Sequence, residues 1–299
     1  MPRNIGFVGV GLMGRGMVHS LVRNGHNLRI YNRTRAKAEE AAAEGGQVVD
    51  SPAEAARGAE VIVTMLADPA AVRSVHEGEN GLLSAIEPGT VVIDSSTISP
   101  PVTLGIAEKL KAKGAEMLDA PVFGSKNEAE NAALGFIVGG DRAVFERVQD
   151  VLESMGKTFY VGSNGMGSYA KLVVNFIIAA SLEAMNEGVV LATKAGVDPE
   201  VMLQIIQTSR ARSGIIEMKA PQVLKRDFSP FFPLRLMDKD LGLVMDTARF
   251  LNVPMLLGGV LKEVYNACMA EGLAEQDFCA SIKFLEEITD VEVKAASNQ

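Results

Sequence analysis

Lys171 and Asn175 are the residues whose types and spacing best suit proton-transfer chemistry in this chain. They lie four residues apart in an apolar run, residues 165–195, that contains no proline. On a helix this spacing stacks the two side chains on one face, with Gly167 one turn before them. Because burying an ammonium is costly unless it is paired or neutral, Lys171 is a candidate general acid that Asn175 orients. The alternative is a lysine that reaches solvent from a helix end beside an incidental amide.

The run around these residues predicts one long central helix, apolar on nearly all sides and therefore buried. The rest of the chain shows no strand alternation. It predicts helices over residues 199–208, 236–250, 257–271 and 276–288, and then a frayed tail from about residue 291. We therefore expect an all-α domain over residues 164–299 for substrate binding and dimerisation.

A glycine motif near the amino terminus predicts a dinucleotide site. An apolar strand over residues 4–8 runs into GVGLMG, residues 9–14, and then into a helix. In this context Gly9 allows a tight turn, Gly11 allows a pyrophosphate to approach the backbone and Gly14 allows close helix packing. Leu12 and Met13 begin the helix whose amino terminus faces the anion. The alternative is a purely structural glycine turn.

Strands and helices continue to alternate up to about residue 163. This pattern predicts the α/β class, with an amino-terminal Rossmann domain, a doubly wound sheet, over residues 1–163. In such sheets ligands bind beyond the carboxyl ends of the strands. We therefore expect Met65 and Leu66 after one strand, and Ser96 and Thr97 after the next, to lie at the cofactor.

The end of the second strand distinguishes between cofactors. NAD-binding domains place Asp or Glu there for the ribose hydroxyls, whereas this chain has Asn32, Arg33 and Thr34. A guanidinium and a hydroxyl suit a 2′-phosphate, so we expect NADP (NADPH). The alternative is that Arg33 and Arg35 are ordinary surface charges at the start of a helix.

Three loops are candidates for substrate contact. Residues 120–126 form a polar, glycine-containing loop after an apolar strand, where backbone N–H groups could meet an anion. Residues 228–234 form an irregular apolar loop that could wall a pocket. Residues 209–214 form a cationic loop that could serve either a substrate carboxylate or the surface, and the surface is slightly favoured. Lys239 is either a cation near the nicotinamide or an ordinary first-turn lysine beside Asp240.

The composition narrows the function classes. A net charge of −8 and an aromatic content of 5% without tryptophan argue against nucleic-acid binding. Cys268 and Cys279 show no metal-binding spacing, so we expect no metal site, and two cysteines in apolar contexts suggest a reducing compartment. No basic-then-apolar leader precedes the first strand, and the longest apolar stretch, residues 172–182, is too short for a membrane span. We expect a cytoplasmic protein that binds no membrane.

Five segments together resemble the β-hydroxyacid dehydrogenases. They are FVGVGLMGRGM (residues 7–17), DSSTISP (94–100), DAPV (119–122), GSYAKLVVN (167–175) and KDL (239–241). This family includes 3-hydroxyisobutyrate dehydrogenase and tartronate semialdehyde reductase. The glyoxylate/succinic semialdehyde reductase branch is the most similar, through NRT (32–34), SPAE (51–54), GSK (124–126) and FPL (232–234).

The resemblance implies that Lys171 is the catalytic lysine, that Asn175 assists at the substrate, and that Thr97 and Lys239 lie at the cofactor. It also implies that the loop after Pro121 binds the substrate carboxylate. The residues expected at the substrate besides Asn175 are Ser96, Phe123, Gly124, Ser125, Phe231 and Asp240. One departure matters, because relatives have serine where this chain has Phe123. Carboxylate binding is then left to backbone N–H groups, Ser125 or Lys126.

These features predict an NADPH-dependent reductase of small aldehyde acids, glyoxylate or succinic semialdehyde, in which Lys171 protonates the developing alkoxide. The related alternatives are a 3-hydroxyisobutyrate or tartronate semialdehyde enzyme. An imine reductase resembles this fold but usually lacks the helix lysine, and a 6-phosphogluconate dehydrogenase needs a longer second domain. A catalytically silent dinucleotide-binding scaffold is disfavoured by the intact Lys171 and Asn175. The apolar central helix needs further cover, which predicts a homodimer or homotetramer.

Overall fold

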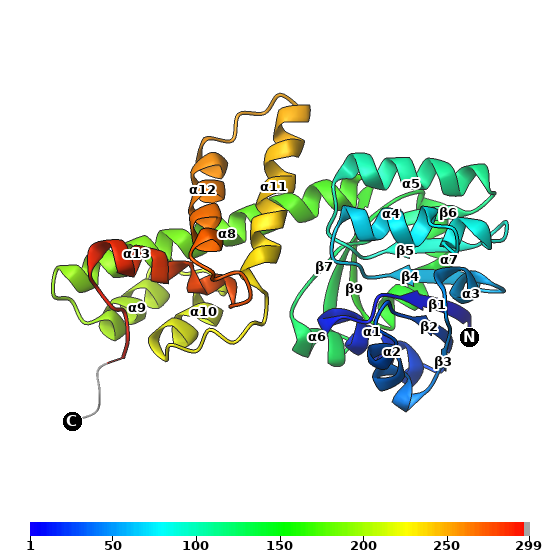
Figure 1. Ribbon diagram of the computed structural model, residues 1–299, viewed down its shortest axis with the longest axis horizontal. Coiled ribbons are helices and arrows are strands. Elements are labelled where there is room, and N and C mark those ends of the chain that lie inside the picture. The colour runs from blue at the N-terminus through cyan, green and yellow to red at the C-terminus, as the bar shows by residue number, and fades with distance from the viewer. Residues whose placement is uncertain (296–299) are drawn as a thin grey trace. The chain divides into compact units, whose positions relative to one another are not determined.

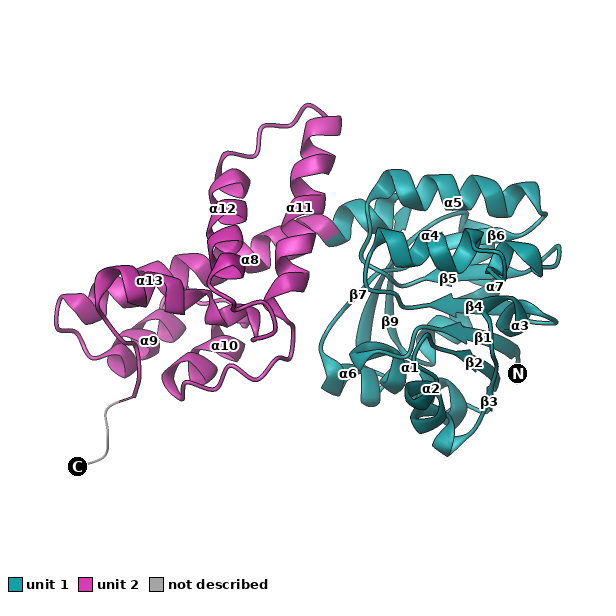
Figure 2. Cartoon of the chain, in the orientation of Figure 1, with its two compact units in different colours: residues 1–171 teal, residues 172–299 magenta. Residues whose placement is uncertain are grey.

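The computed structural model describes residues 1–295 and divides into two compact units, Met1–Lys171 and Leu172–Gln299 (Figure 2). The long helix α8, Met166–Lys194, belongs to both units: its first turns lie in the first and the rest in the second. The class expected from the sequence, an α/β Rossmann sheet followed by an all-helical domain, is confirmed (Figure 1).

The first unit is built on one nine-stranded sheet with the order β3-β2-β1-β4-β5-β6-β8-β7, in which β9 also pairs with β8. The strands β1 to β6 pair in parallel, β8 runs antiparallel to β6 and β7, and β9 is parallel to β8. The strands are Asn4–Val8, Asn27–Tyr31, Gln47–Val48, Val61–Thr64, Val91–Asp94, Glu116–Asp119, Val122–Phe123, Leu134–Gly139 and Gly156–Gly162.

Helices cover both faces of this sheet, and alternate strand residues enter opposite cores. Val61 and Val63 pack with α1, α2, α6 and α7, whereas Ile62 packs with α3, α4 and α5. The near-continuous apolar strands follow from this arrangement, because a parallel sheet is buried on both sides. The helices are Leu12–Arg23, Arg35–Ala41, Pro52–Ala56, Pro69–Glu77, Pro100–Ala112, Lys126–Glu130 and Arg142–Glu153, with short 3₁₀ turns at Ala42–Glu44 and Leu82–Ser84.

The second unit is helical and packs around α8. Its core includes Ala179, Leu182, Met185 and Val189 from that helix. Its other elements are α9 (Pro199–Thr208), α10 (Gly214–Leu224), α11 (Leu234–Phe250), α12 (Leu256–Ala270), a 3₁₀ turn (Phe278–Ser281) and α13 (Ile282–Thr289).

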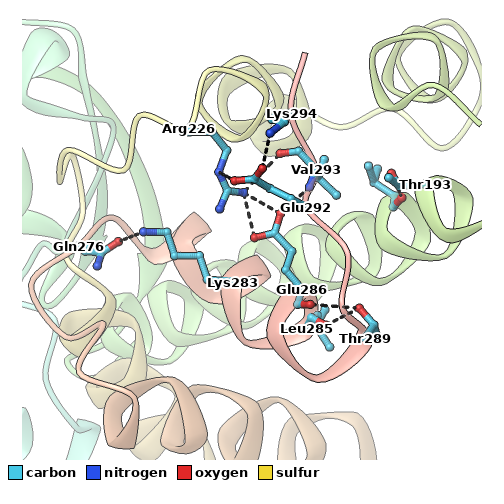
Figure 3. Close-up of polar contacts among 11 residues, drawn as sticks. Thr193, Arg226, Gln276, Lys283, Leu285, Glu286, Thr289, Glu292, Val293 and Lys294 are labelled. Carbon is cyan, nitrogen blue, oxygen red and sulfur yellow. Dashed lines mark hydrogen bonds and ion pairs between the residues drawn. The ribbon is translucent and has the colours of Figure 1, made fainter. Parts of the chain in front are cut away.

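For residues 291–295 the structure corrects the expectation of a frayed tail from about residue 291, whereas residues 296–299 lie outside the described part of the chain. Val293 is fully buried, and its N–H donates to Glu286 Oε1 at 2.7 Å. Arg226 donates to both carboxylate oxygens of Glu286, at 2.6 and 2.8 Å, and to the carbonyl of Val293 (Figure 3). The N–H of Ala295 donates to the carbonyl of Leu224. Arg226 and Leu224 lie far from residues 293 and 295 in the sequence, so the local composition gives no sign of these contacts.

The long helix is also less covered than expected, because Val173, Ile177 and Leu191 are more than half exposed. By length and composition alone α8 could cross a membrane, so the expectation that the apolar stretch is too short for a span is corrected. The packing of Ala179, Leu182 and Met185 in the core of the second unit favours a core helix, which passes the same test.

Candidate active site

The glycine motif forms the turn between β1 and α1, and its three glycines differ in their surroundings. A Cβ at Gly9 would lie 2.2 Å from the carbonyl oxygen of Met65, and one at Gly14 would lie 2.1 Å from the carbonyl oxygen of Gly9. At Gly11 a Cβ would meet nothing within 4 Å. Gly9 and Gly14 are therefore required for tight packing, while the backbone at Gly11 is open to a ligand. This is the arrangement that a dinucleotide pyrophosphate needs at a helix amino terminus.

Asn32 braces this turn from the end of β2. Its Oδ1 accepts from the N–H of Val10 at 3.0 Å, and its Nδ2 donates to the carbonyl of Thr34 at 2.9 Å. The two arginines that follow differ in their engagement. Arg35 pairs with Glu39 and Asp50, whereas the exposed Arg33 has no acidic partner at ion-pair distance among residues 1–295. Arg33 is thus the guanidinium available to a ligand.

The carboxyl ends of β4 and β5 are joined by a buried polar network. Thr64 donates to Asp94 Oδ1 at 2.8 Å, and the same oxygen accepts from the N–H of Ser96. The hydroxyl of Ser96 accepts from the N–H of Leu66 at 2.9 Å. Ser96 therefore supports the edge where Met65, Leu66 and Thr97 are half-buried, and its contact with substrate stays a prediction.

The first turn of α8 docks at the end of β6. Asp119, which is buried, accepts from the N–H of Gly165 at 2.8 Å and of Ser168 at 2.9 Å. Burial raises the pKa of Asp119 to about 6, although these hydrogen bonds act in the opposite direction. Lys171, 8% exposed, follows on the next turn of the helix. No role for Asp119 was predicted from the sequence, although a carboxylate at the end of an apolar strand was the available signal.

The predicted substrate loop contains a short strand, β7, where the sequence suggested only a loop. The ring of Phe123 covers Gly135 on β8, so that a Cβ at Gly135 would lie 2.0 Å from its Cζ. It also lies 5.7 Å from the ring of Phe159. The ring of Phe123 has no hydrogen-bond donor, so it cannot offer a substrate carboxylate the hydroxyl that the resemblance implies at this position.

Ser125 is the amino-terminal cap of α6. Its N–H donates to Glu128 at 2.8 Å, and its hydroxyl is also bonded to that carboxylate in a capping box. Both donors that Ser125 could offer a substrate carboxylate are therefore engaged, and they are engaged by an anion. Gly124, which lies between Phe123 and Ser125 in the sequence, has a φ of +120°, a backbone conformation that favours glycine.

In the second unit, Asn175, Lys239 and Asp240 lie together. The Nδ2 of Asn175 donates to Asp240 Oδ2 at 2.6 Å, and Lys239 Nζ lies 2.9 Å from Asp240 Oδ1. Asn175 and Asp240 are both buried. The carboxylate thus joins α8 to α11 and fixes the amide of Asn175.

The apolar loop that carries Phe231 is held by a buried ion pair. Lys219 Nζ lies 2.8 Å from Asp277 Oδ1, with both side chains at most 1% exposed. Asp277 Oδ2 accepts from the N–H groups of Phe231 and Phe232, at 3.0 and 3.1 Å. The sequence gives no local sign of this pair, because its members lie 58 positions apart.

The structure thus gathers the predicted residues into two sets. The cofactor residues of the glycine turn, β2, β4 and β5, together with the start of α8, lie at the carboxyl edge of the sheet in the first unit. Asn175, Lys239 and Asp240 lie in the second unit. Residues 1–295 contain no cluster of three or more His, Cys, Asp or Glu side chains that could hold a metal ion.

Two family matches cover most of the chain. Residues 4–162 match the family described as the NAD binding domain of 6-phosphogluconate dehydrogenase. Residues 165–285 match the family described as NAD-binding of NADP-dependent 3-hydroxyisobutyrate dehydrogenase.

Curated relatives match over nearly their full length. A probable mitochondrial 3-hydroxyisobutyrate dehydrogenase of Dictyostelium discoideum is 36% identical, with 95% of this chain and 91% of the relative covered. Glyoxylate/succinic semialdehyde reductase 1 of Arabidopsis thaliana is 34% identical, with 93% and 97% covered. A solved structure of Mycobacterium tuberculosis 3-hydroxyisobutyrate dehydrogenase with L-serine superposes with a TM-score of 0.88 at 34% identity, covering 95% of this chain and 99% of that one.

Proposed function

The chain belongs to the β-hydroxyacid dehydrogenase family, and from this premise we propose that it is an NADPH-dependent reductase of small aldehyde acids. It is an oxidoreductase that acts on CH–OH groups and uses a nicotinamide dinucleotide. The observation that carries the proposal is that Lys171 and Asn175 are both buried and lie four residues apart on α8, in a chain whose glycine turn is open at Gly11.

In the proposed reaction, Lys171 delivers a proton to the carbonyl oxygen as that oxygen becomes an alkoxide. When bound, the reduced nicotinamide supplies the hydride to the carbonyl carbon. Asn175 holds the oxygen or the lysine in place, and Asp240 orients Asn175 by accepting from its Nδ2. General acid catalysis of this kind contributes roughly a hundred- to ten-thousandfold to the rate.

The preference for NADPH rests on the end of β2. No carboxylate stands there to bind ribose hydroxyls, and the exposed Arg33 is available to a 2′-phosphate. The backbone around Asn32 is fixed by its bonds to Val10 and Thr34, so the position of Arg33 relative to the glycine turn is set.

Glyoxylate and succinic semialdehyde are the proposed substrates, on the evidence of the resemblance carried by the NRT, SPAE, GSK and FPL segments and of the similarity to the Arabidopsis relatives. The alternative, which the relatives also support, is a 3-hydroxyisobutyrate or tartronate semialdehyde enzyme. The substrate loop favours neither set of substrates. Phe123 has no hydrogen-bond donor, and the donors of Ser125 are engaged by Glu128.

We further propose a cytoplasmic homodimer or homotetramer. Large apolar side chains are more than half exposed on α8 (Val173, Ile177 and Leu191) and on α12 (Leu256, Leu257 and Val260). A second copy of the chain would remove them from water. Cys268 and Cys279 are both buried and free, as expected in a reducing compartment. A monomeric mass by light scattering at micromolar concentration would overturn the assembly.

The reductase proposal is tested by mixing the protein with NADPH and each aldehyde acid and following the absorbance of the reduced nicotinamide. Lys171→Ala should lower kcat by at least a hundredfold while NADPH still binds, as followed by its fluorescence. The matched control is Lys194→Ala at the far end of the same helix, where Lys194 donates to the carbonyl of Thr289. An unchanged kcat in Lys171→Ala would remove the mechanism.

A further inference from the structure

We propose that Asp119 is the positioning residue for Lys171. Its carboxylate, at the end of β6, holds the first turn of α8 on the sheet and so determines where the lysine projects. Only the expected effect on kcat rests on the proposed function, in which Lys171 is the general acid. The positioning itself follows from contacts within the first unit.

The residue before α8 is Gly165, which has no side chain with which to cap the helix. The N–H of Met166 donates to the carbonyl of Ser163, but the N–H groups of Gly165 and Ser168 need another acceptor. Other helices are capped by the residue that precedes them: α4 by Asp68, α7 by Asp141 and α9 by Asp198. For α8 the acceptor comes from 46 residues earlier. A cap drawn from another element ties the helix to the sheet as well as completing its first turn.

Glycines allow this close docking. A Cβ at Gly167 would lie 2.5 Å from the carbonyl oxygens of Asp119 and Ile137, and a Cβ at Gly139 would lie 2.8 Å from Asp119 Oδ1. The hydroxyl of Ser168 adds contacts with Asp119 at 3.3 Å and with Thr103 on α5 at 3.0 Å. The first turn of α8 is therefore fixed to β6, β8 and α5 together.

The helix geometry transmits this placement to the lysine. Gly167 faces the backbone of β6 and β8, and Lys171 lies four residues later, on the same face and about 6 Å further along the axis. An axial rotation or shift of the first turn would displace the ammonium by a comparable amount. Because a misplacement of about 1 Å can cost a hundredfold in rate, the Asp119 contacts bear directly on proton transfer.

Substitution of Asp119 gives the first test. Asp119→Ala should lower kcat by about a hundredfold with the KM for NADPH unchanged, since the glycine turn is untouched. Asp119→Asn, which keeps one oxygen acceptor, should recover part of the loss. The matched control is Asp141→Ala, because Asp141 caps α7 in the same unit by accepting from the N–H groups of Ala143 and Val144. It should lower the melting temperature while leaving kcat unchanged.

Amide hydrogen exchange gives a readout that needs no enzymatic activity. The N–H groups of Gly165 and Ser168 should exchange at least tenfold faster in Asp119→Ala than in the wild type, because both acceptor oxygens are removed, and in Asp141→Ala they should be unaffected. Unchanged exchange at these two amides, or unchanged kcat in both Asp119 variants of an active enzyme, would overturn the inference. A wild-type protein that reduces no aldehyde acid would instead remove the proposed function and leave the exchange result to decide the positioning.

Discussion

The amide of Asn175 donates a 2.6 Å hydrogen bond to the carboxylate of Asp240, whose other oxygen faces Lys239 Nζ at 2.9 Å. This contact joins the helix of the proposed general acid to α11. Because Asn175 Nδ2 is directed at Asp240, Asn175 Oδ1 must point away from Asp240. Asp240 therefore determines which group Asn175 presents in the proposed site.

Removal of Asp240 should impair turnover. In Asp240→Ala, Asn175 loses the acceptor that orients it and Lys239 loses its counter-ion. A hydrogen bond to a charged group is worth about 1.5–3 kcal/mol, so kcat should fall roughly ten- to hundredfold. Steady-state kinetics provide the measurement. Asp238→Ala on the same helix is the control, because Asp238 pairs with Lys262; an equal loss in both variants would show that the effect comes from α11 generally.

Arg33 should determine the cofactor preference. Arg33→Ala should raise the Kd for NADPH by roughly ten- to hundredfold and leave the Kd for NADH nearly unchanged, because only NADPH carries the 2′-phosphate. Titration by nicotinamide fluorescence measures both constants. Arg35→Ala is the matched control, since Arg35 already pairs with Glu39 and Asp50. Equal weakening of NADPH and NADH binding by Arg33→Ala would contradict the assignment.

Phe123 should limit the use of small carboxylate substrates. Phe123→Ser removes the ring over Gly135 and adds a hydroxyl to the substrate loop. If glyoxylate binds there, its KM should fall by about tenfold, the contribution of one hydrogen bond to a charged group. Phe159→Ser is the control, because it breaks the same ring contact without adding a donor to the loop. A KM that stays constant or rises would show that the carboxylate is bound elsewhere.

Much of this architecture follows from local signals. The glycine turn and the long helix were predictable because periodicity and turn chemistry are short-range properties. The helix α10 escaped prediction because it begins at Gly214 and contains Pro221, two residues that disfavour helices. The burial of Val293 depends on Arg226 and Glu286. Likewise, the role of Asp119 depends on its distance from Gly165, which no pattern within either segment encodes.

Glu183, at the centre of the second unit, should make the stability of the protein depend on pH. Burial raises its pKa from 4.5 to about 7, although Ser281 and Asn186 donate to it. Glu183 Oε1 and Asn186 Oδ1 have no hydrogen-bond partner among the described residues. If Glu183 Oε1 carries a proton it becomes a donor, so that fewer buried acceptors lack a partner. This is a second reason for the carboxyl group to stay neutral.

Because the folded-state pKa is raised, the contribution of Glu183 to stability is complete below about pH 4.5 and is lost as the pH rises through about 7. The loss is on the order of 3 kcal/mol by pH 8. Glu183→Gln cannot ionise, so its free energy of unfolding should fall less between pH 5.5 and pH 8.5 than that of the wild type, as urea titrations at roughly these two values would show. The exposed Glu217→Gln is the control and should follow the wild type. If Glu183→Gln and the wild type lose the same stability over this interval, Glu183 is ionised in the folded protein throughout it.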